Sequence, residues 1–175
     1  MSKTTENMKT AFAGESMARN KYTFFAKAAR KEGYHYIAKL FEETATHEMR
    51  HANDHFKLLG GLGDTAANLK DAISGEEYET TTMYPEFAAI AKKEGNKEAA
   101  ALFSQLGKIE QHHRERFKKL LARVENGTVF SREEPIQWKC SLCGHVHKGT
   151  EPPPRCPSCK HPKEYYEPAS LENDM

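Results

Sequence analysis

Four cysteines in two CxxC pairs are the most specific chemical signal in the sequence. The pairs are Cys140/Cys143 and Cys156/Cys159; 12 residues separate them, and they contain every cysteine of the chain. Four thiolates from two tight turns can bind one metal ion in a tetrahedral site, which selects iron or zinc. The spacing taken alone favours a structural zinc ribbon, so the choice of metal depends on the rest of the chain.

A second set of possible metal ligands precedes the cysteines. Two ExxH motifs, Glu48–His51 and Glu110–His113, each place a carboxylate and an imidazole one helical turn apart on one face. A glutamate from each of two helices plus ExxH from two others is the ligand set of di-iron and di-manganese bundles. Without metal, so many inward acids would be costly to bury. Three further carboxylates complete the predicted set, namely Glu15, Glu76 and Glu79.

The composition of residues 3–125 predicts the helices that must carry these ligands. The segment contains one proline, Pro85, and is rich in Ala, Glu, Lys and Leu, which favour helix. Glycines divide it into four predicted helices, at about 4–31, 34–59, 68–93 and 97–125. Gly33 and Gly95 are typical of tight turns, so we expect two antiparallel helical hairpins.

An internal repeat indicates how the hairpins are related. Residues 22–33 and 84–95 share a pattern at an offset of 62, which also relates Glu48 to Glu110 and His51 to His113. Two related hairpins predict a pseudo-twofold four-helix bundle. His47, His51 and His55 form an alternative HxxxH stripe, and we favour His51 because it has a repeat mate.

The offset leaves one ligand open. It places Glu77, rather than Glu76, opposite Glu15. The GExxE motif of Gly75–Glu79 favours Glu76, and a π-bulge of one residue would reconcile the two. Tyr22 and Tyr84 are repeat mates near the acids, either as core aromatics or as phenols that hydrogen-bond within the site.

Residues 126–136 predict a linker or one short strand before a small second unit rich in Cys, Pro, Gly and His. That unit is too small for an ordinary apolar core, so a metal must hold it together. We therefore predict two domains, residues 1–130 and 131–175. Trp138, just before the first cysteine pair, is expected to cover the metal site.

Charge and hydropathy exclude several partners. The 26 basic residues nearly balance the 25 acidic ones, giving a net charge of +1, so we expect no nucleic acid and no membrane partner. The sequence shows no transmembrane run and no secretory signal. Paired CxxC motifs in such a chain fit metal better than disulfides, and we expect a cytoplasmic protein.

Long segments of the chain resemble the rubrerythrin family. AFAGESMARNKY (11–22), FEETATHEMRHA (41–52), GEEYETTTMYPEFA (75–88) and IEQHHRERF (109–117) are similar to its di-iron helices. The segment WKCSLCGHVHKGTEPPPRCPSCKHPK (138–163) is similar to its C-terminal rubredoxin-like unit. The resemblance implies a mainly α fold class, with a ferritin-like four-helix bundle followed by a small rubredoxin-like metal-bound β/loop domain.

The resemblance also implies residue roles. Glu48 and Glu110 match the pair that bridges two iron ions, and His51 matches a ligand that replaces Glu79 when the site is reduced. Tyr22 and Tyr84 match tyrosines that hydrogen-bond within the site. The remaining matched ligands are Glu15, Glu76 and His113 in the bundle, and Cys140, Cys143, Cys156 and Cys159, which hold one iron ion.

Rubrerythrins are non-haem peroxidases that reduce hydrogen peroxide to water and protect cells from oxidative stress. The resemblance therefore implies this activity, a homodimer, and an electron donor that is either an NAD(P)H-dependent reductase or a separate rubredoxin. It also makes iron, rather than zinc, the expected metal of the four-cysteine site. Two alternatives stay open: a ferroxidase or iron-handling protein of ferritin type, and a non-enzymatic binding module with a zinc ribbon.

Overall fold

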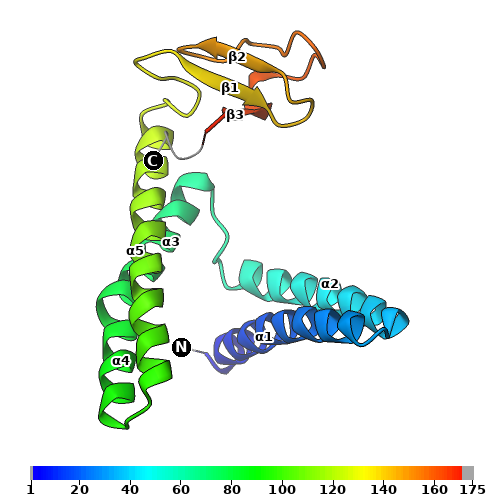
Figure 1. The fold of residues 1–175 in the computed structure, drawn as a ribbon, viewed down its shortest axis with the longest axis vertical. Coiled ribbons are helices and arrows are strands. Elements are labelled where there is room, and N and C mark those ends of the chain that lie inside the picture. Colours follow the sequence, from blue (N-terminus) through cyan, green and yellow to red (C-terminus); the bar gives the residue numbers. More distant parts are fainter. Residues whose placement is uncertain (1, 171–175) are drawn as a thin grey trace. The chain divides into compact units, whose positions relative to one another are not determined.

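The computed structural model describes residues 2–170, so residues 171–175 of the predicted second domain lie outside it. Contacts divide the chain into two compact units. Residues 1–63, here the N-terminal hairpin, contain α1 (Lys3–Lys31) and α2 (His35–Leu58) (Figure 1). Residues 64–175, here the C-terminal unit, contain α3 (Thr65–Tyr78), a π-helix (Glu79–Met83), α4 (Tyr84–Lys93), α5 (Lys97–Glu125), β1 (Ile136–Cys140), β2 (Val146–Gly149), a 3-10 helix (Lys163–Tyr165) and β3 (Tyr166–Pro168).

The N-terminal hairpin is held together by small residues. Ala26 and Ala29 of α1 pack against Ala38 of α2, and all three are buried. Alanine lets two helix backbones approach closely, so the helices run side by side (Figure 1). Gly33 ends α1 with a positive φ of 88°, which glycine adopts without a steric penalty. The predicted antiparallel hairpin is thus confirmed.

The helices of the C-terminal unit repeat this design. Ala88, Ala91 and Ala100 are buried at positions 62 residues after their counterparts in the N-terminal hairpin. Gly95 has a φ of 77° and closes the second hairpin as Gly33 closes the first. The predicted helix of 68–93 differs in one respect, because the π-helix Glu79–Met83 interrupts it. A π-helix adds one residue to the turn, and a bulge of this kind is what would reconcile the GExxE motif with the sequence repeat.

Each hairpin also carries the same aromatic cluster. In the N-terminal hairpin, the ring of Phe41 lies 6.1 Å from that of Tyr22 and 5.6 Å from that of Phe25. In the C-terminal unit, the corresponding distances from Phe103 are 6.2 Å to Tyr84 and 5.5 Å to Phe87. These separations are typical of aromatic pairs that stabilise a fold. The equivalence of the clusters shows that the repeat in the sequence is a repeat in structure.

Residues 136–168 form a three-stranded antiparallel sheet in the order β2-β1-β3. Its core consists of Trp138, Cys140, Cys156 and Tyr166, all buried. Trp138 donates a hydrogen bond from Nε1 to the carbonyl of Gly149 at 3.0 Å. Because two of the four core residues are cysteines of the CxxC pairs, the core of this sheet and the cysteine site are one structure.

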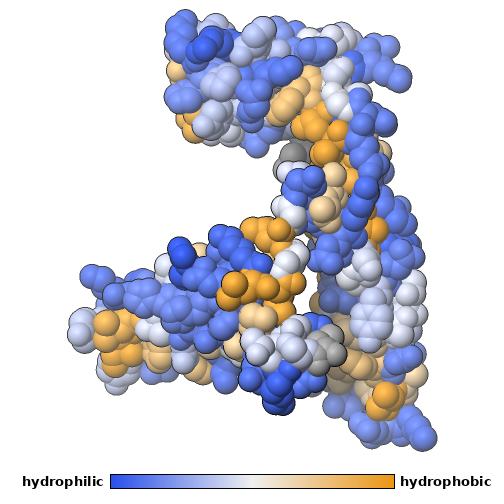
Figure 2. Space-filling model, turned by 180° about the vertical axis from the view of Figure 1, so that it is seen from behind, coloured by the Kyte–Doolittle hydropathy of each residue, from blue (hydrophilic) through white to orange (hydrophobic). Residues whose placement is uncertain are grey.

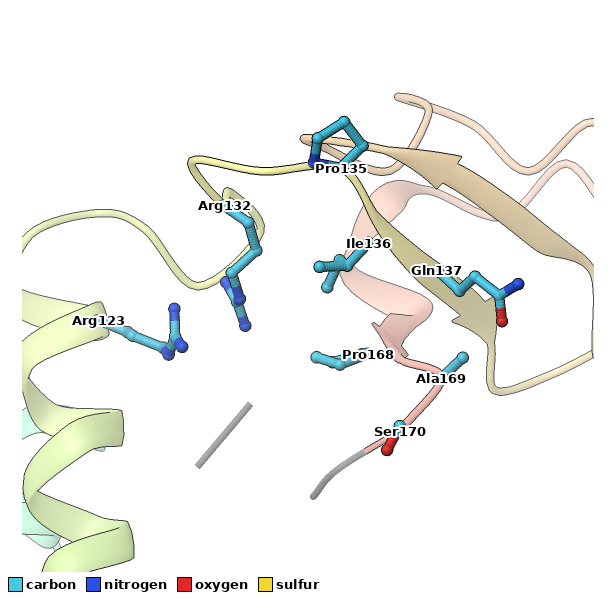
Figure 3. A pocket seen from close by; sticks show the side chains of 8 residues that line it. All are labelled: Arg123, Arg132, Pro135, Ile136, Gln137, Pro168, Ala169 and Ser170. Atoms are coloured by element: carbon cyan, nitrogen blue, oxygen red, sulfur yellow. The ribbon is translucent and has the colours of Figure 1, made fainter. Parts of the chain in front are cut away.

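The connection from α5 to β1 is fixed by Arg132. Its guanidinium lies 5.0 Å from the centre of the Trp138 ring and donates to the carbonyls of Thr128 and Ser131 at 3.0 and 2.6 Å. Figure 3 shows Arg123 and Arg132 beside a pocket whose opposite wall is formed by Ile136 and Pro168. The segment predicted as a linker is therefore packed against the sheet. None of the described helices is long and apolar enough to cross a membrane.

Candidate metal centres

Glu15, Glu48 and His51 meet on the N-terminal hairpin. The Nδ1 atom of His51 lies 3.0 Å from Oε2 of Glu48 and 4.0 Å from Oε2 of Glu15. One turn of α2 separates Glu48 from His51, and the antiparallel packing of α1 brings Glu15 to the same level. The three side chains place one ligand atom each within 4.8 Å of one another, as a metal site requires.

The C-terminal unit carries an equivalent group, formed by Glu76, Glu110 and His113. Nδ1 of His113 lies 2.7 Å from Oε2 of Glu110 and 3.7 Å from Oε1 of Glu76. Side-chain exposure follows the same order in both groups, with the ExxH glutamate least exposed at 17% and 14% and the histidine most exposed at 54% and 41%. Both groups combine two carboxylates with one imidazole, which suits divalent iron, manganese or zinc.

The π-helix decides which α3 glutamate joins the group. Glu76 faces His113, whereas Glu77 lies 3.6 Å from the guanidinium of Arg114 and is half exposed. An unbroken α-helix would keep the repeat in register and place Glu77 opposite Glu15. The extra residue between Glu76 and Tyr84 restores the register of the aromatic cluster, while Glu76 takes the inward position.

Without metal, the pKa values of the carboxylates are shifted, which shows the electrostatic cost of bringing these groups together. A hydrogen-bonding contact in which Glu48 is the acceptor, followed by partial burial, raises the pKa of Glu15, while the same contact lowers the pKa of Glu48. Burial and then the charge of Glu110 raise the pKa of Glu76, whose Oε2 is buried and has no hydrogen-bond partner in the described part of the chain. A buried acceptor without a donor fits a metal ligand, because a cation would supply the missing partner.

The raised pKa of Glu76 predicts a pH-dependent effect of Glu76→Gln on the metal-free protein. A raised pKa in the folded state makes stability fall as pH rises from the unfolded value of about 4.5 through the folded value. Metal-free E76Q should therefore be more stable than the wild type at pH 7, and the difference should vanish towards pH 4.5. Urea unfolding followed by circular dichroism checks this. Glu77→Gln is the matched control, and an E76Q gain that persists at pH 4.5 would contradict burial of the charge as its cause.

Glu79 and Tyr84 lie beside the C-terminal group rather than within it. Glu79 is the first residue of the π-helix. Burial, followed by the charge of Glu79 and then that of Glu110, raises the pKa of Tyr84, so its phenol keeps its proton at neutral pH. Tyr22 occupies the equivalent place in the aromatic cluster of the N-terminal hairpin. The ligand role of Glu79 and the hydrogen-bonding roles of the tyrosines stay predictions.

Two features near these groups were not predicted. Thr80, one residue after Glu79 in the π-helix, has a buried hydroxyl that finds no hydrogen-bond partner among residues 2–170. A threonine in a TTT run gives no sequence signal of such a position. His47 and His55 of the alternative stripe are not members of the N-terminal group. The charge of His47 adds a small contribution to the lowered pKa of Glu48. The charge of His55 offsets a small part of the rise in the pKa of Glu15.

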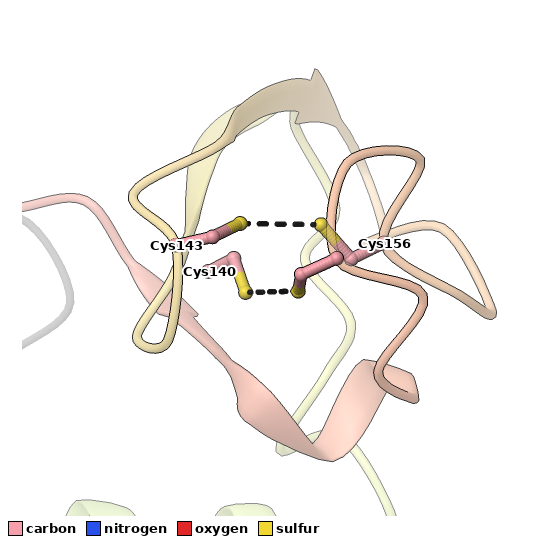
Figure 4. Close-up of side chains that lie close together, drawn as sticks. Cys140, Cys143 and Cys156 are labelled. Carbon is pink, nitrogen blue, oxygen red and sulfur yellow. Dashed lines mark hydrogen bonds between the residues drawn. The ribbon is translucent and has the colours of Figure 1, made fainter.

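The four cysteines converge at one end of the sheet, as Figure 4 shows. The Sγ atoms of Cys140 and Cys159 lie 3.7 Å apart, and those of Cys143 and Cys156 lie 3.6 Å apart. A tetrahedron with metal–sulfur bonds of about 2.3 Å has edges of about 3.8 Å, whereas a disulfide bond is only about 2.05 Å long. The donor set therefore fits a single tetrahedral metal ion and excludes disulfides.

The thiol pKa values point to the same conclusion. Burial raises the pKa of Cys156, but the nearby Tyr166 hydroxyl and the backbone N–H of Cys159 more than offset it and bring the value to about 5. For Cys159, the backbone N–H of His161 lowers the pKa, but burial and the neighbouring thiols raise it to about 12. Because the sulfurs repel one another as thiolates, full ionisation of the set needs a cation.

Tyr166 is a further part of this site that the sequence did not predict. Its hydroxyl is buried, forms no hydrogen bond within the described residues, and lies beside Cys156. It can therefore donate to the charged sulfur once the metal is bound, and such contacts tune metal–thiolate sites. Tyr166 gave no signal because it is one of two adjacent tyrosines just after the second cysteine pair, and neither belongs to a metal-ligand motif.

Comparisons with known proteins agree with both sites. Residues 6–121 match the family model described as Rubrerythrin, and residues 138–167 match that of the rubrerythrin rubredoxin-like domain. Rubrerythrin from Porphyromonas gingivalis is 47% identical, covering 95% of this chain and 90% of that protein. Rubrerythrin from Nitratidesulfovibrio vulgaris is 42% identical, covering 95% and 94%.

Among solved structures, partially reduced nigerythrin is 35% identical, covering 96% of this chain and 87% of that one, with a TM-score of 0.38. The family models cover both the helical segment and the cysteine segment, which confirms the resemblance and the ferritin-like class of the helical part. The acid–histidine groups and the four cysteines thus correspond to a rubrerythrin-type site and a rubredoxin-like site. The chain belongs to the rubrerythrin family.

Proposed function

We propose that this chain is a non-haem di-iron peroxidase that reduces hydrogen peroxide to water and receives electrons through its own four-cysteine iron centre. Membership of the rubrerythrin family supports an oxidoreductase role linked to oxidative stress. The observation that carries the finer proposal is the pair of equivalent Glu–Glu–His groups in a chain that also carries a tetrahedral four-thiol set. A binding module made of a zinc ribbon on a helical scaffold would not require the two Glu–Glu–His groups.

The residues present fit two irons in the helical site and one in the sheet. The carboxylates of Glu15, Glu48, Glu76 and Glu110 balance the charge of two ferrous ions, with His51 and His113 as neutral ligands. The bound irons would supply the two electrons that the reduction of peroxide consumes, and the sulfur-bound iron would return electrons one at a time. We propose that the donor to the sulfur-bound iron is an NAD(P)H-dependent reductase or a rubredoxin.

Protonated side chains of this chain can assist the reduction of peroxide. Reduction of one peroxide takes two electrons and two protons and yields two waters. The phenol of Tyr84, kept protonated by burial and nearby carboxylates, could donate a hydrogen bond to the peroxide substrate.

Glu79→Ala is expected to slow peroxide turnover by about tenfold while the helical site keeps its iron. Oxidation of the bound irons would add positive charge to the site, and we propose that Glu79 would be available as a fifth carboxylate ligand in place of His51. Glu79 is close enough for its charge to raise the pKa of both Glu76 and Tyr84, after larger effects of burial. Steady-state peroxidase kinetics and iron analysis check this against Glu77→Ala as control. Unchanged kinetics in E79A would refute the exchange.

The direct test of the proposed function is peroxide consumption by the reduced, iron-loaded protein under anaerobic conditions. A peroxidase consumes peroxide in proportion to the electrons supplied, releases no dioxygen, and keeps its iron bound. A ferroxidase of ferritin type would oxidise added ferrous iron with dioxygen and retain it as a mineral, and the four-cysteine centre would take no part. Dioxygen release, or iron oxidation that proceeds faster with dioxygen than with peroxide, would contradict the proposal.

A further inference from the structure

We propose that Tyr166 stabilises the ferrous state of the four-cysteine centre by donating a hydrogen bond to the Cys156 thiolate, and so raises the reduction potential of the bound iron. Tyr166 acts on the iron through one of its ligands, so it is a positioning residue rather than a catalytic one. This inference rests on the four-cysteine iron centre of the proposed function, because it concerns which oxidation state of that iron the chain favours.

The hydroxyl of Tyr166 lies in the apolar core of the sheet. The residue is 4% exposed and packs with Trp138, Cys140 and Cys156, which are fully buried. Hydrophilic side chains, blue in Figure 2, make up most of the surface around this core on the side shown. Within residues 2–170 the hydroxyl has no hydrogen-bond partner. Because a buried hydroxyl without a partner costs free energy that phenylalanine would avoid, we expect it to find its partner in the metal-loaded site.

Backbone hydrogen bonds fix Tyr166 against the first cysteine pair. In the antiparallel pairing of β1 with β3, Tyr166 lies opposite Cys140. The carbonyl of the preceding residue, Tyr165, accepts two hydrogen bonds from Ser141, one from its backbone N–H at 2.8 Å and one from its Oγ at 2.9 Å. A shift of Tyr166 away from the cysteines would therefore break these contacts, so the hydroxyl is held beside the site in advance of metal binding.

The two cysteine pairs form equivalent turns, so they can be compared directly. The N–H of Cys140 donates to the carbonyl of His145, and the N–H of Cys156 donates to the carbonyl of His161, both at 2.8 Å. The first cysteine of each pair is fully buried. Because the backbone surrounds the two sulfurs in the same way, a difference between them must come from other neighbours, and Tyr166 is one.

The thiol pKa values indicate on which sulfur the hydroxyl acts. Burial raises the pKa of Cys140, and the backbone N–H groups of Cys143 and Leu142 contribute to lowering it below its ordinary value. Burial also raises the pKa of Cys156, but the Tyr166 hydroxyl is the largest of the influences that bring it down to about 5. Within residues 2–170, no tyrosine is among the main influences on Cys140. Tyr166 therefore gives the second turn a donor that the first turn lacks.

A donor to sulfur favours the ferrous state because of the charge of the centre. Four thiolates around a ferrous ion carry one more negative charge than the same thiolates around a ferric ion. A hydrogen bond to a thiolate strengthens as the sulfur becomes more negative, so it stabilises the ferrous state more than the ferric state. Such hydrogen bonds are among the factors that set the potentials of iron–sulfur centres. The centre would thus take up an electron more readily and hold it until the helical site needs it.

A redox titration of the iron-loaded full chain, followed by visible absorbance, tests the role of Tyr166. Tyr166→Phe removes the hydroxyl and keeps the ring. At a fixed applied potential, its ratio of ferrous to ferric centre should be about tenfold lower than in the wild type, which is a fall of about 59 mV for a one-electron couple. The thiolate-to-Fe(III) charge-transfer band should move to longer wavelength, since the sulfur loses a stabilising donor. Unchanged Trp138 fluorescence would show that the core is intact.

Tyr165→Phe is the matched control, because it removes the same hydroxyl from the adjacent residue. Tyr165 is 42% exposed, and its ring lies 5.2 Å from that of His161 rather than in the core. The ferrous-to-ferric ratio of this variant should stay within about twofold of the wild type, since an exposed hydroxyl keeps its contact with water. A potential that is unchanged or higher in Tyr166→Phe, or an equal fall in both variants, would overturn the inference.

Zinc binding tests the hydrogen bond without iron or peroxide. Zinc with four thiolates carries the same charge as the ferrous centre, so Tyr166→Phe should bind zinc about tenfold more weakly than the wild type and than Tyr165→Phe. Competition with a chelator measures this, and equal zinc affinity in all three proteins would contradict donation to the thiolate. A lowered potential in Tyr166→Phe, with a wild-type protein that consumes no peroxide, would leave the role of Tyr166 standing and refute the proposed peroxidase function. The two inferences can therefore fail separately.

Discussion

Replacing Glu110 with alanine should lower the iron affinity of the helical site by at least about 100-fold and slow peroxide reduction by a similar factor. Loss of a contact to a metal ligand alone typically costs 10–100-fold, and Glu110 is itself a proposed bridging ligand. Its carboxylate is the least exposed of the C-terminal group and lies 2.7 Å from Nδ1 of His113. Iron titration and peroxide kinetics measure the two effects.

Glu77→Gln is the control for this prediction. Glu77 lies on the same helix as Glu76 but faces Arg114 at 3.6 Å and is half exposed. Iron affinity and peroxide kinetics of this variant should stay within about twofold of the wild type, because an exposed ion pair contributes little. Equal losses in the two variants would mean that any charge change near α5 disturbs the site, and the assignment of Glu110 would be refuted.

Removal of metal from the four-cysteine site should unfold residues 136–168 while the helices persist. Two of the four core residues of this sheet are Cys140 and Cys156, and structural metal ions in such small units contribute on the order of 10 kcal/mol. Trp138 is the only tryptophan of the chain and is fully buried in this core. Its fluorescence should therefore shift to the red on chelation, with little change in helical circular dichroism.

Cys156→Ser should reproduce this unfolding without a chelator, because a serine hydroxyl is a poor ligand and leaves a polar group in the core. Leu142→Ser is the control, since Leu142 lies between the first two cysteines yet is half exposed. It should keep a buried Trp138. A Trp138 spectrum that does not change in Cys156→Ser would mean that the sheet folds without its metal.

The sequence predicted the helical hairpins because their signals are local. Gly33 and Gly95 adopt the positive φ angles that the tight turns require, and the helix ends agree with the predicted ones within about three residues. The two ExxH motifs required only helical periodicity, so their side chains come together as expected with Glu15 and Glu76. The π-helix was predictable as well, because one extra residue is the simplest way to reconcile a motif with a repeat.

Other features depend on contacts that no local pattern encodes. The burial of the Thr80 and Tyr166 hydroxyls depends on a π-helix and on a strand pairing, respectively. Lys160 has a positive φ of 64° at the position where the first cysteine pair has Gly144, although lysine seldom adopts this conformation. The division into two units at residues 63 and 64 was not predicted, because the sequence repeat led us to expect one bundle formed by both hairpins. The predicted domain boundary at residue 130 stays a prediction.

Anaerobic stopped-flow absorbance tests the central claim most directly. The iron-loaded, fully reduced protein is mixed with hydrogen peroxide, and the thiolate-to-Fe(III) charge-transfer band of the four-cysteine centre is followed. The account predicts rapid colour in the wild type and in Glu77→Gln, and slow colour in Glu110→Ala with its four-cysteine centre intact. Colour that develops slowly in the wild type, or equally fast in Glu110→Ala, would show that the helical site does not reduce peroxide and pass the oxidation to the sulfur-bound iron.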